Sequence, residues 1–186
     1  MLKTLSPTNF RNFAKQQFQF GEGVNVINAP NASGKTNILE AIFFLATGKS
    51  FKARVESEVI RHGQDIARIA GNGLEIVLTN GFIDIGKPGL EKVAKKKLTV
   101  NGIPKRLIDF AGNIKVTLFA PSDLELVTDS PSLRRNFLDT VLSQSDREYR
   151  RAIGSYEKGV RQRNKLLWRV REEGLSRSHL LFWNQQ

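Results

Sequence analysis

The pattern of hydrophobic and polar positions along the chain changes at Pro121. Before it, short apolar runs alternate with turn residues, a pattern that is typical of β-strands. Asn101-Gly102 is a hairpin signal, and Gly71-Asn72-Gly73 separates two further apolar runs. The predicted strands are the beginning of 2–13, then 18–20, 24–28 (expected to be buried), 65–70, 74–79, 98–100 and 114–119, with a weakly patterned stretch at 81–89.

The second part of the chain has helical spacing. Residues 132–142 predict a helix with Ser132 as its N-cap behind Pro131. Residues 146–172 predict a long amphipathic helix that Gly174 ends. Its apolar stripe consists of Tyr149, Ile153, Tyr156, Val160, Leu167 and Val170. Such a stripe needs an apolar partner, so the helix either packs on the strand-rich part or has its natural partner outside this chain.

Length and composition limit the class of protein. The 186 residues suffice for one domain or slightly more, and 40% of them are hydrophobic, which allows a sizeable core. The chain has no cysteine, which excludes disulfides and thiolate metal sites, and its two histidines lie far apart. No apolar run reaches the length of a membrane span, and the N-terminus lacks the apolar region of a signal peptide. We therefore expect a soluble cytoplasmic protein without a membrane partner.

The charge is strongly basic. Lysine and arginine total 29 against 18 acidic residues, which gives a formal net charge of +11. Such an excess favours a polyanionic partner, with nucleic acid first among the candidates.

Residues 28–41 carry the most specific chemistry. They read N-A-P-N-A-S-G-K-T-N-I-L-E-A, between the predicted strand 24–28 and a predicted helix at 36–47 that Gly48 ends. Gly34-Lys35-Thr36 within them matches the end of a phosphate-binding loop. The strand-loop-helix context makes the short motif credible.

The residue types fit the binding of a nucleoside triphosphate such as ATP. Backbone N–H groups of such a loop and the positive end of the helix dipole attract phosphate. Lys35 would reach the β- and γ-phosphates, and the Thr36 hydroxyl would bind Mg²⁺. Gly34 would allow close approach of the backbone. The full pattern G-x-x-x-x-G-K-[ST] has Ala29 at its first position, and a positive φ there would cost about 1–2 kcal/mol.

Several blocks of the sequence resemble the recombination protein F (RecF) family of DNA replication and repair ATPases, whose heads are related to those of SMC and ABC-type ATPases. The opening block is 9–13, N-F-R-N-F, and the loop block is 31–42, N-A-S-G-K-T-N-I-L-E-A-I. Lys49-Ser50-Phe51, 58–63 and Gln162-Arg163-Asn164 are similar to further family blocks. The most specific pair is 120–127, A-P-S-D-L-E-L-V, followed by 130–139, S-P-S-L-R-R-N-F-L-D.

The resemblance implies a fold class and a function. The expected fold is α/β, a P-loop NTPase of the ABC/SMC head type, with a mixed sheet and the phosphate-loop helix in 1–130 and the beginning of a helical lobe in 131–186. The implied function is ATP-dependent dimerisation of two heads that clamps single-stranded or gapped DNA in replication, recombinational repair and the SOS response. The implied partners are DNA, a second copy of the head and other recombination mediator proteins. The implied nucleotide-site residues are Arg11, Asn31, Ala32, Ser33, Gly34, Lys35, Thr36 and Asn37, with Arg11 near the base or the phosphates.

The chain departs from the family pattern at a few positions. Ala29 stands where glycine is usual, whereas Ala32 lies within ordinary variation; Ser122 replaces an acidic residue and Asp129 a glycine. The family's signature motif and its Walker B strand with the catalytic glutamate have no counterpart here, so no residue of this chain is assigned a catalytic role. We expect a fragment that does not hydrolyse ATP alone, although the resemblance implies that the intact protein is an ATPase.

Two alternatives remain open. The first is an ATP-dependent DNA clamp, and the second is a non-hydrolysing fragment that binds DNA or a partner with a vestigial loop. For nucleic acid, the candidate residues are Arg134, Arg135, Lys95, Lys96 and Lys97, together with the basic face of the long helix. A solvated surface or a salt-bridged helix start is the competing explanation for these cations.

Overall fold

The computed structural model describes residues 1–83, 91–128 and 130–184. The chain divides into two compact units, Met1–Ser145 and Asp146–Gln186. Most of the weakly patterned stretch 81–89, and the departure at Asp129, lie outside the described residues.

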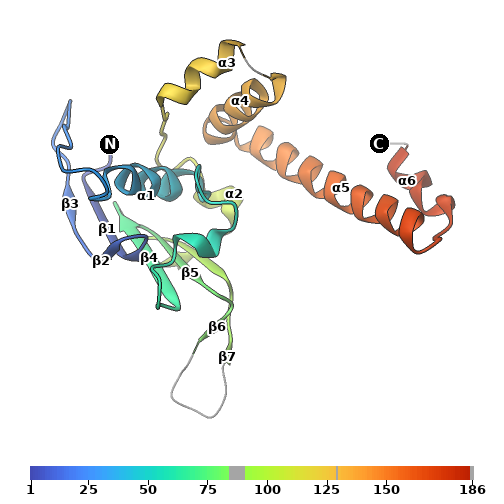
Figure 1. Cartoon of the computed structure of the whole chain (residues 1–186), viewed down its shortest axis with the longest axis horizontal. Coiled ribbons are helices and arrows are strands. Elements are labelled where there is room, and N and C mark those ends of the chain that lie inside the picture. Colours follow the sequence, from blue (N-terminus) through green and yellow to red (C-terminus); the bar gives the residue numbers. More distant parts are fainter. Residues whose placement is uncertain (84–90, 129, 185–186) are drawn as a thin grey trace. The chain divides into compact units, whose positions relative to one another are not determined.

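The first unit is built on an antiparallel sheet (Figure 1). Along the sheet the order is β2-β1-β4-β5-β8-β9, and β3 also pairs with β1. The strands are β1 (Thr4–Phe10), β2 (Phe13–Lys15), β3 (Phe18–Gln19), β4 (Ile66–Gly71), β5 (Leu74–Thr79), β8 (Lys96–Val100) and β9 (Ile103–Pro104). A separate pair consists of β6 (Phe82–Ile83) and β7 (Glu91–Lys92).

Two tight turns join neighbouring strands as the sequence predicts. Asn72 and Gly73 have φ values of 49° and 76°, and Asn101 and Gly102 have 49° and 78°. Positive φ at both central residues matches the right-handed twist of the paired strands. The β4–β5 and β8–β9 hairpins are therefore confirmed.

Helix α1 (Lys35–Thr47) packs its apolar face on this sheet. Phe44 and Leu45 are fully buried together with Ile69 and Ile76 of the strands. The helix ends at Gly48, whose φ of 72° lets its N–H donate to the Phe44 carbonyl at 2.7 Å. The predicted helix and its glycine end are confirmed, and the sheet fixes the position of the loop that precedes the helix.

The predicted strands 24–28 and 114–119 are wrong, since neither belongs to a strand of the described residues. Val24 and Val26, expected to be buried, are 91% and 85% exposed. A strand exists only where a neighbour completes its backbone hydrogen bonds. Every strand pair in the described ranges is antiparallel, so the parallel part of the expected mixed sheet is not formed there.

A side chain takes the place of a neighbouring strand at Val116. The Gln144 amide accepts from the Val116 N–H at 2.8 Å and donates to the Val116 carbonyl at 2.9 Å. Gln144 is buried in α4 (Pro131–Ser145), so the extended segment is tied to that helix.

The other helices of the first unit are short, namely η1 (Glu56–Val59), α2 (Leu107–Phe110), η2 (Pro121–Leu124) and α3 (Glu125–Thr128). Helix α4 begins at Pro131, so Ser132 is its second residue and the predicted N-cap at Ser132 is wrong. Proline is favoured at the first helical position because it has no N–H to leave unpaired.

The second unit consists of α5 (Arg147–Glu172), η3 (Arg177–Leu180) and α6 (Leu181–Asn184). The Asp146 carboxylate caps α5 by accepting from the N–H groups of Glu148 at 2.7 Å and Tyr149 at 3.1 Å. Gly174 follows its end with a φ of 69°. The long helix is confirmed, and no helix within the described residues has the length and apolar character of a membrane span.

Candidate nucleotide-binding site

The candidate loop leads from residue 28 into α1, and two of its residues have left-handed backbone conformations. Gly34 has a φ of 107° and Ala32 a φ of 63°, whereas Ala29 does not take a positive φ. The cost expected for alanine at position 29 therefore does not arise there. It arises at Ala32, because a Cβ disfavours the left-handed region.

Lys35 folds back over its own loop. Its Nζ donates to the carbonyl oxygens of Ala29 at 2.5 Å and Pro30 at 2.8 Å. The amine thus lies against the beginning of the loop, and the two ends of the loop are held together.

The start of α1 offers further donors. The first helical bond runs from the Ile38 N–H to the Gly34 carbonyl, and no side chain caps this end of the helix. The N–H groups of Lys35, Thr36 and Asn37 precede that bond and lie at the positive end of the helix dipole. Thr36 is exposed. The lysine amine and the first-turn N–H groups can donate hydrogen bonds to phosphate oxygens, and the Thr36 hydroxyl oxygen can bind a divalent cation. Together these groups form a donor set that fits a polyphosphate with its bound cation.

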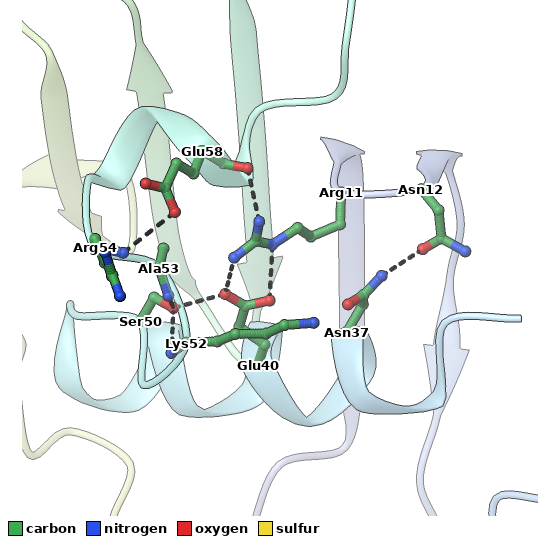
Figure 2. Close-up of polar contacts among 9 residues, drawn as sticks. All are labelled: Arg11, Asn12, Asn37, Glu40, Ser50, Lys52, Ala53, Arg54 and Glu58. Carbon is green, nitrogen blue, oxygen red and sulfur yellow. Dashed lines mark hydrogen bonds and ion pairs between the residues drawn. The ribbon is translucent and has the colours of Figure 1, made fainter. Parts of the chain in front are cut away.

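Arg11 lies in the turn between β1 and β2, and its guanidinium is bonded to protein on all three nitrogens (Figure 2). Nε and Nη2 donate to the two Glu40 carboxylate oxygens at 2.9 and 2.6 Å, and Nη1 donates to the Glu58 carbonyl at 2.8 Å. This geometry differs from the contact with base or phosphate that we expected. A direct role of Arg11 at the nucleotide stays a prediction that requires these bonds to open.

Glu40 is the buried centre of this network. Its side chain is fully buried in α1, and Oε1 also accepts from the Ser50 hydroxyl at 2.6 Å. Ser50 Oγ in turn accepts from the N–H groups of Lys52 at 2.9 Å and Ala53 at 2.8 Å. Three segments that are separate in the sequence, the β1–β2 turn, α1 and residues 50–58, are therefore connected through one carboxylate (Figure 2).

Backbone bonds hold the turn from the other side. The Arg11 N–H donates to the Val59 carbonyl at 2.7 Å, and the Arg61 N–H donates to the Asn9 carbonyl at 2.8 Å. Asn9 and Arg11 have φ values of 49° and 53°, which are rare for residues other than glycine. The surrounding hydrogen bonds offset the free-energy cost of this strained backbone.

Sequence reasoning missed Glu40 and Asn12 as residues of the site. Asn12 Nδ2 donates to the Ser33 carbonyl, and Asn37 donates to Asn12. A signal for Glu40 was present, because it is a lone acidic residue among the apolar positions of 38–46. Of the predicted residues, Ser33 and Asn37 both bond to Asn12, and Lys35 bonds to the beginning of the loop. The exposed ones include Asn31 and Thr36.

Lys96, one of the predicted nucleic-acid residues, is bonded within the protein. Its Nζ donates to the Gly48 carbonyl at 2.8 Å, forms an ion pair with Glu56 and lies 5.6 Å from the centre of the Phe44 ring. Alternate residues of a strand share one face, and Lys96 lies on the same face of β8 as buried Leu98. The lysine therefore takes part in the protein's own packing, and its contact with DNA stays a prediction that requires these bonds to open.

The other candidate cations differ in surroundings. Lys95 and Lys97 are exposed on either side of Lys96. Arg134 Nη1 donates to the Leu126 carbonyl at 3.1 Å, so its guanidinium contacts α3, and Arg135 is exposed on α4. A role of these four residues in DNA binding stays a prediction.

Replacing Ala32 by glycine is expected to stabilise the chain. Removing the Cβ at φ 63° relieves about 1–2 kcal/mol of strain in the folded chain. Glycine also gives the unfolded chain more conformational freedom, which lowers the stability by about 0.4–1 kcal/mol. The expected net gain of about 0.5–1 kcal/mol can be measured by urea unfolding. Ala53→Gly is the control because Ala53 has no positive φ, and an equal change in both variants would contradict the assignment of strain to Ala32.

Comparisons with known proteins agree with this geometry. An AAA domain model matches residues 4–73, which contain β1, the loop and α1. A solved structure from work on SMC ATPases superposes on this chain with a TM-score of 0.54 at 19% identity, covering 75% of this chain and 98% of that chain. It is described as "Structural biochemistry of ATP-driven dimerization and DNA stimulated activation of SMC ATPases". The fold and the loop thus define a P-loop NTPase of the ABC/SMC head type.

The sequence relatives give the family. The chain is 38% identical to the DNA replication and repair protein RecF of Lachnospira eligens, over 90% of this chain and 45% of that protein. It is 40% identical to that of Symbiobacterium thermophilum, over 94% and 46%. The solved structure of the recombination mediator protein RecF-ATPrS in the RecFOR pathway superposes with a TM-score of 0.79 at 33% identity, over 98% of this chain and 49% of that chain. We assign the chain to the RecF family over the part of these proteins that it covers, which is about half their length.

Proposed function

We propose that this chain is the ATP-binding portion of a DNA repair and recombination protein. The observation that carries the proposal is the donor set around Lys35 at the start of α1. A structure titled RecF-ATP in the RecFOR pathway also superposes on the chain with a TM-score of 0.76 at 34% identity, covering 98% of this chain and 48% of that one.

In this proposal each group has a defined task. Lys35 leaves the carbonyls of Ala29 and Pro30 and places its positive charge at the β- and γ-phosphates. The N–H groups at the start of α1 bind the remaining phosphate oxygens. The Thr36 hydroxyl holds Mg²⁺, which neutralises charge on the triphosphate.

The experiment that tests the proposal is a titration of the chain with a fluorescent ATP analogue, with and without Mg²⁺. We expect saturable binding that unlabelled ATP competes away and that Mg²⁺ strengthens. Failure to bind in both conditions would overturn ATP binding by this chain and favour the alternative, a vestigial loop on a fragment that binds DNA or a partner.

We propose further that DNA is bound along one face of α5. Arg151, Lys158 and Lys165 are exposed and seven residues apart, so they share a face that drifts by only about 20° per step. They span about 21 Å of helix at 1.5 Å per residue, enough to follow several phosphates of a strand. The apolar stripe through Ile153 and Val160 lies on the opposite side of the helix.

Removing these three charges is expected to reduce the salt dependence of DNA binding. The triple variant Arg151→Gln, Lys158→Gln, Lys165→Gln should lower the slope of log K against log salt by about 2, since each phosphate contact of a single strand contributes about 0.7. Fluorescence anisotropy of a labelled single strand at several salt concentrations measures this slope. The matched control, Lys3→Gln, Lys15→Gln, Lys105→Gln, removes the same charge from exposed positions in the first unit. Equal losses in both triples would show a diffuse electrostatic effect and contradict a defined face.

ATP-dependent pairing with a second copy of the head is the third part of the proposal. A bound triphosphate exposed at the start of α1 presents a negatively charged surface that a second protein surface would complete. Sedimentation of the chain with and without ATP tests this part, and other recombination mediator proteins remain candidate partners.

A further inference from the structure

Asn12 connects the turn of the β1–β2 hairpin to the phosphate loop. Its Nδ2 donates to the Ser33 carbonyl at 2.9 Å, and its Oδ1 accepts from Asn37 Nδ2 at 2.9 Å. Figure 2 shows the second of these bonds, beside the Arg11–Glu40 pair. The amide of one side chain is therefore shared between the loop and the first turn of α1.

The same side chain explains why residue 34 is a glycine. A Cβ on Gly34 would lie 2.7 Å from both amide atoms of Asn12 and 2.9 Å from Phe13 Cζ. A Cβ does not approach non-bonded heavy atoms within 3.0 Å, and the φ of 107° is also unfavourable for residues other than glycine. The space that a side chain at position 34 would need is filled by Asn12 and Phe13.

The Asn12 bond also orients the peptide between Ser33 and Gly34. In a planar trans peptide the C=O and the N–H of the next residue point in opposite directions. Because Asn12 holds the Ser33 carbonyl on its own side, the Gly34 N–H points away from Asn12. In a phosphate-binding loop, backbone N–H groups such as this one are the phosphate ligands.

We propose that Asn12 is a positioning residue that sets the direction of the Gly34 N–H for phosphate binding. The inference rests on the ATP binding proposed above. Asn12 is itself held in place, because the neighbouring Arg11 is bonded to Glu40 in α1 and to the backbone of Glu58 and Val59. The hairpin turn thereby supports the loop from outside the motif. Asn12 lies seventeen residues before Ala29, where the phosphate-loop motif begins.

The test uses two variants of the whole chain. Asn12→Ala removes both bonds, whereas Asn12→Asp keeps an acceptor for Asn37 but has no donor for the Ser33 carbonyl. We expect both variants to bind ATP about tenfold more weakly, the upper end of the effect of one hydrogen bond. Amide hydrogen exchange at Gly34 and Lys35 should also become several-fold faster, with exchange in β4 and β5 unchanged.

Two controls separate this role from a general structural one. Gln16→Ala alters an exposed amide on the same hairpin and should leave both measurements unchanged, and Asn37→Ala should have a smaller effect because the Ser33 bond remains. Unchanged exchange at Gly34 in the Asn12 variants would overturn the inference, as would faster exchange with unchanged ATP affinity. Absence of ATP binding by the unaltered chain would instead contradict the proposed function, and the exchange measurement would still decide whether Asn12 holds the loop.

Discussion

Replacing Arg11 by alanine is expected to lower the free energy of unfolding by about 3–5 kcal/mol, the usual cost of removing one partner of a buried ion pair. The Glu40 carboxylate is fully buried and receives two bonds from Arg11. Without the guanidinium the carboxylate keeps the bond from the Ser50 hydroxyl but has no positive charge to pair with, and a buried charge without compensation is strongly unfavourable. Urea unfolding followed by circular dichroism measures the change.

Arg68→Ala is the matched control. Arg68 forms an ion pair with Glu75 at 3.0 Å, but its side chain is 56% exposed. Exposed pairs contribute about 0–1 kcal/mol, so this variant should unfold almost like the unaltered chain. A loss at Arg11 no larger than that at Arg68 would contradict the central role of the buried network. The double variant Arg11→Met, Glu40→Leu removes both charges and should recover much of the loss.

Replacing Lys35 by alanine is expected to weaken ATP binding about 10- to 100-fold, since hydrogen bonds to charged groups contribute about 1.5–3 kcal/mol. The variant loses the positive charge at the phosphates. The bonds from Nζ to Ala29 and Pro30 exist in the free loop and break when ATP binds, so their loss does not add to this effect. Titration with the fluorescent ATP analogue measures the dissociation constant.

The control for Lys35 is Lys15→Ala, which removes the same charge from an exposed position on the nearby hairpin. It should bind ATP within about twofold of the unaltered chain, because screened charges at the surface contribute little. Saturable binding that survives Lys35→Ala would place the nucleotide elsewhere on the chain. A thermal unfolding scan of Lys35→Ala shows whether a loss of binding arises from unfolding.

The local parts of the fold could be predicted from the sequence. The hairpin turns need Asn-Gly with positive φ, and the end of α1 needs the glycine at 48. The long α5 follows from its spacing, since the interior glycines 154 and 159 lower helix propensity by only about 1 kcal/mol each. These features depend on residues that are neighbours along the chain.

The strand predictions failed where the outcome depends on distant partners. Residues 24–28 and 114–119 have strand composition, but no neighbouring strand pairs with them within the described residues. The bonds of Lys96 could not be predicted for a related reason, because the pattern of charges does not show that Gly48 and Glu56 approach the amine. Apolar runs and charge runs alone do not specify which segments meet.

The sequence by itself determined the phosphate-loop motif, the helix that follows it, the hairpins and the family resemblance, because each depends on local spacing. Only the tertiary structure decided that Arg11 pairs with Glu40, that Asn12 supports Gly34 and that the strained alanine is Ala32 rather than Ala29. Those features join residues that are 21 to 29 positions apart or depend on the exact backbone of the loop. Their free energies come from burial and from paired polar groups, which exist only after the sheet and α1 have packed together.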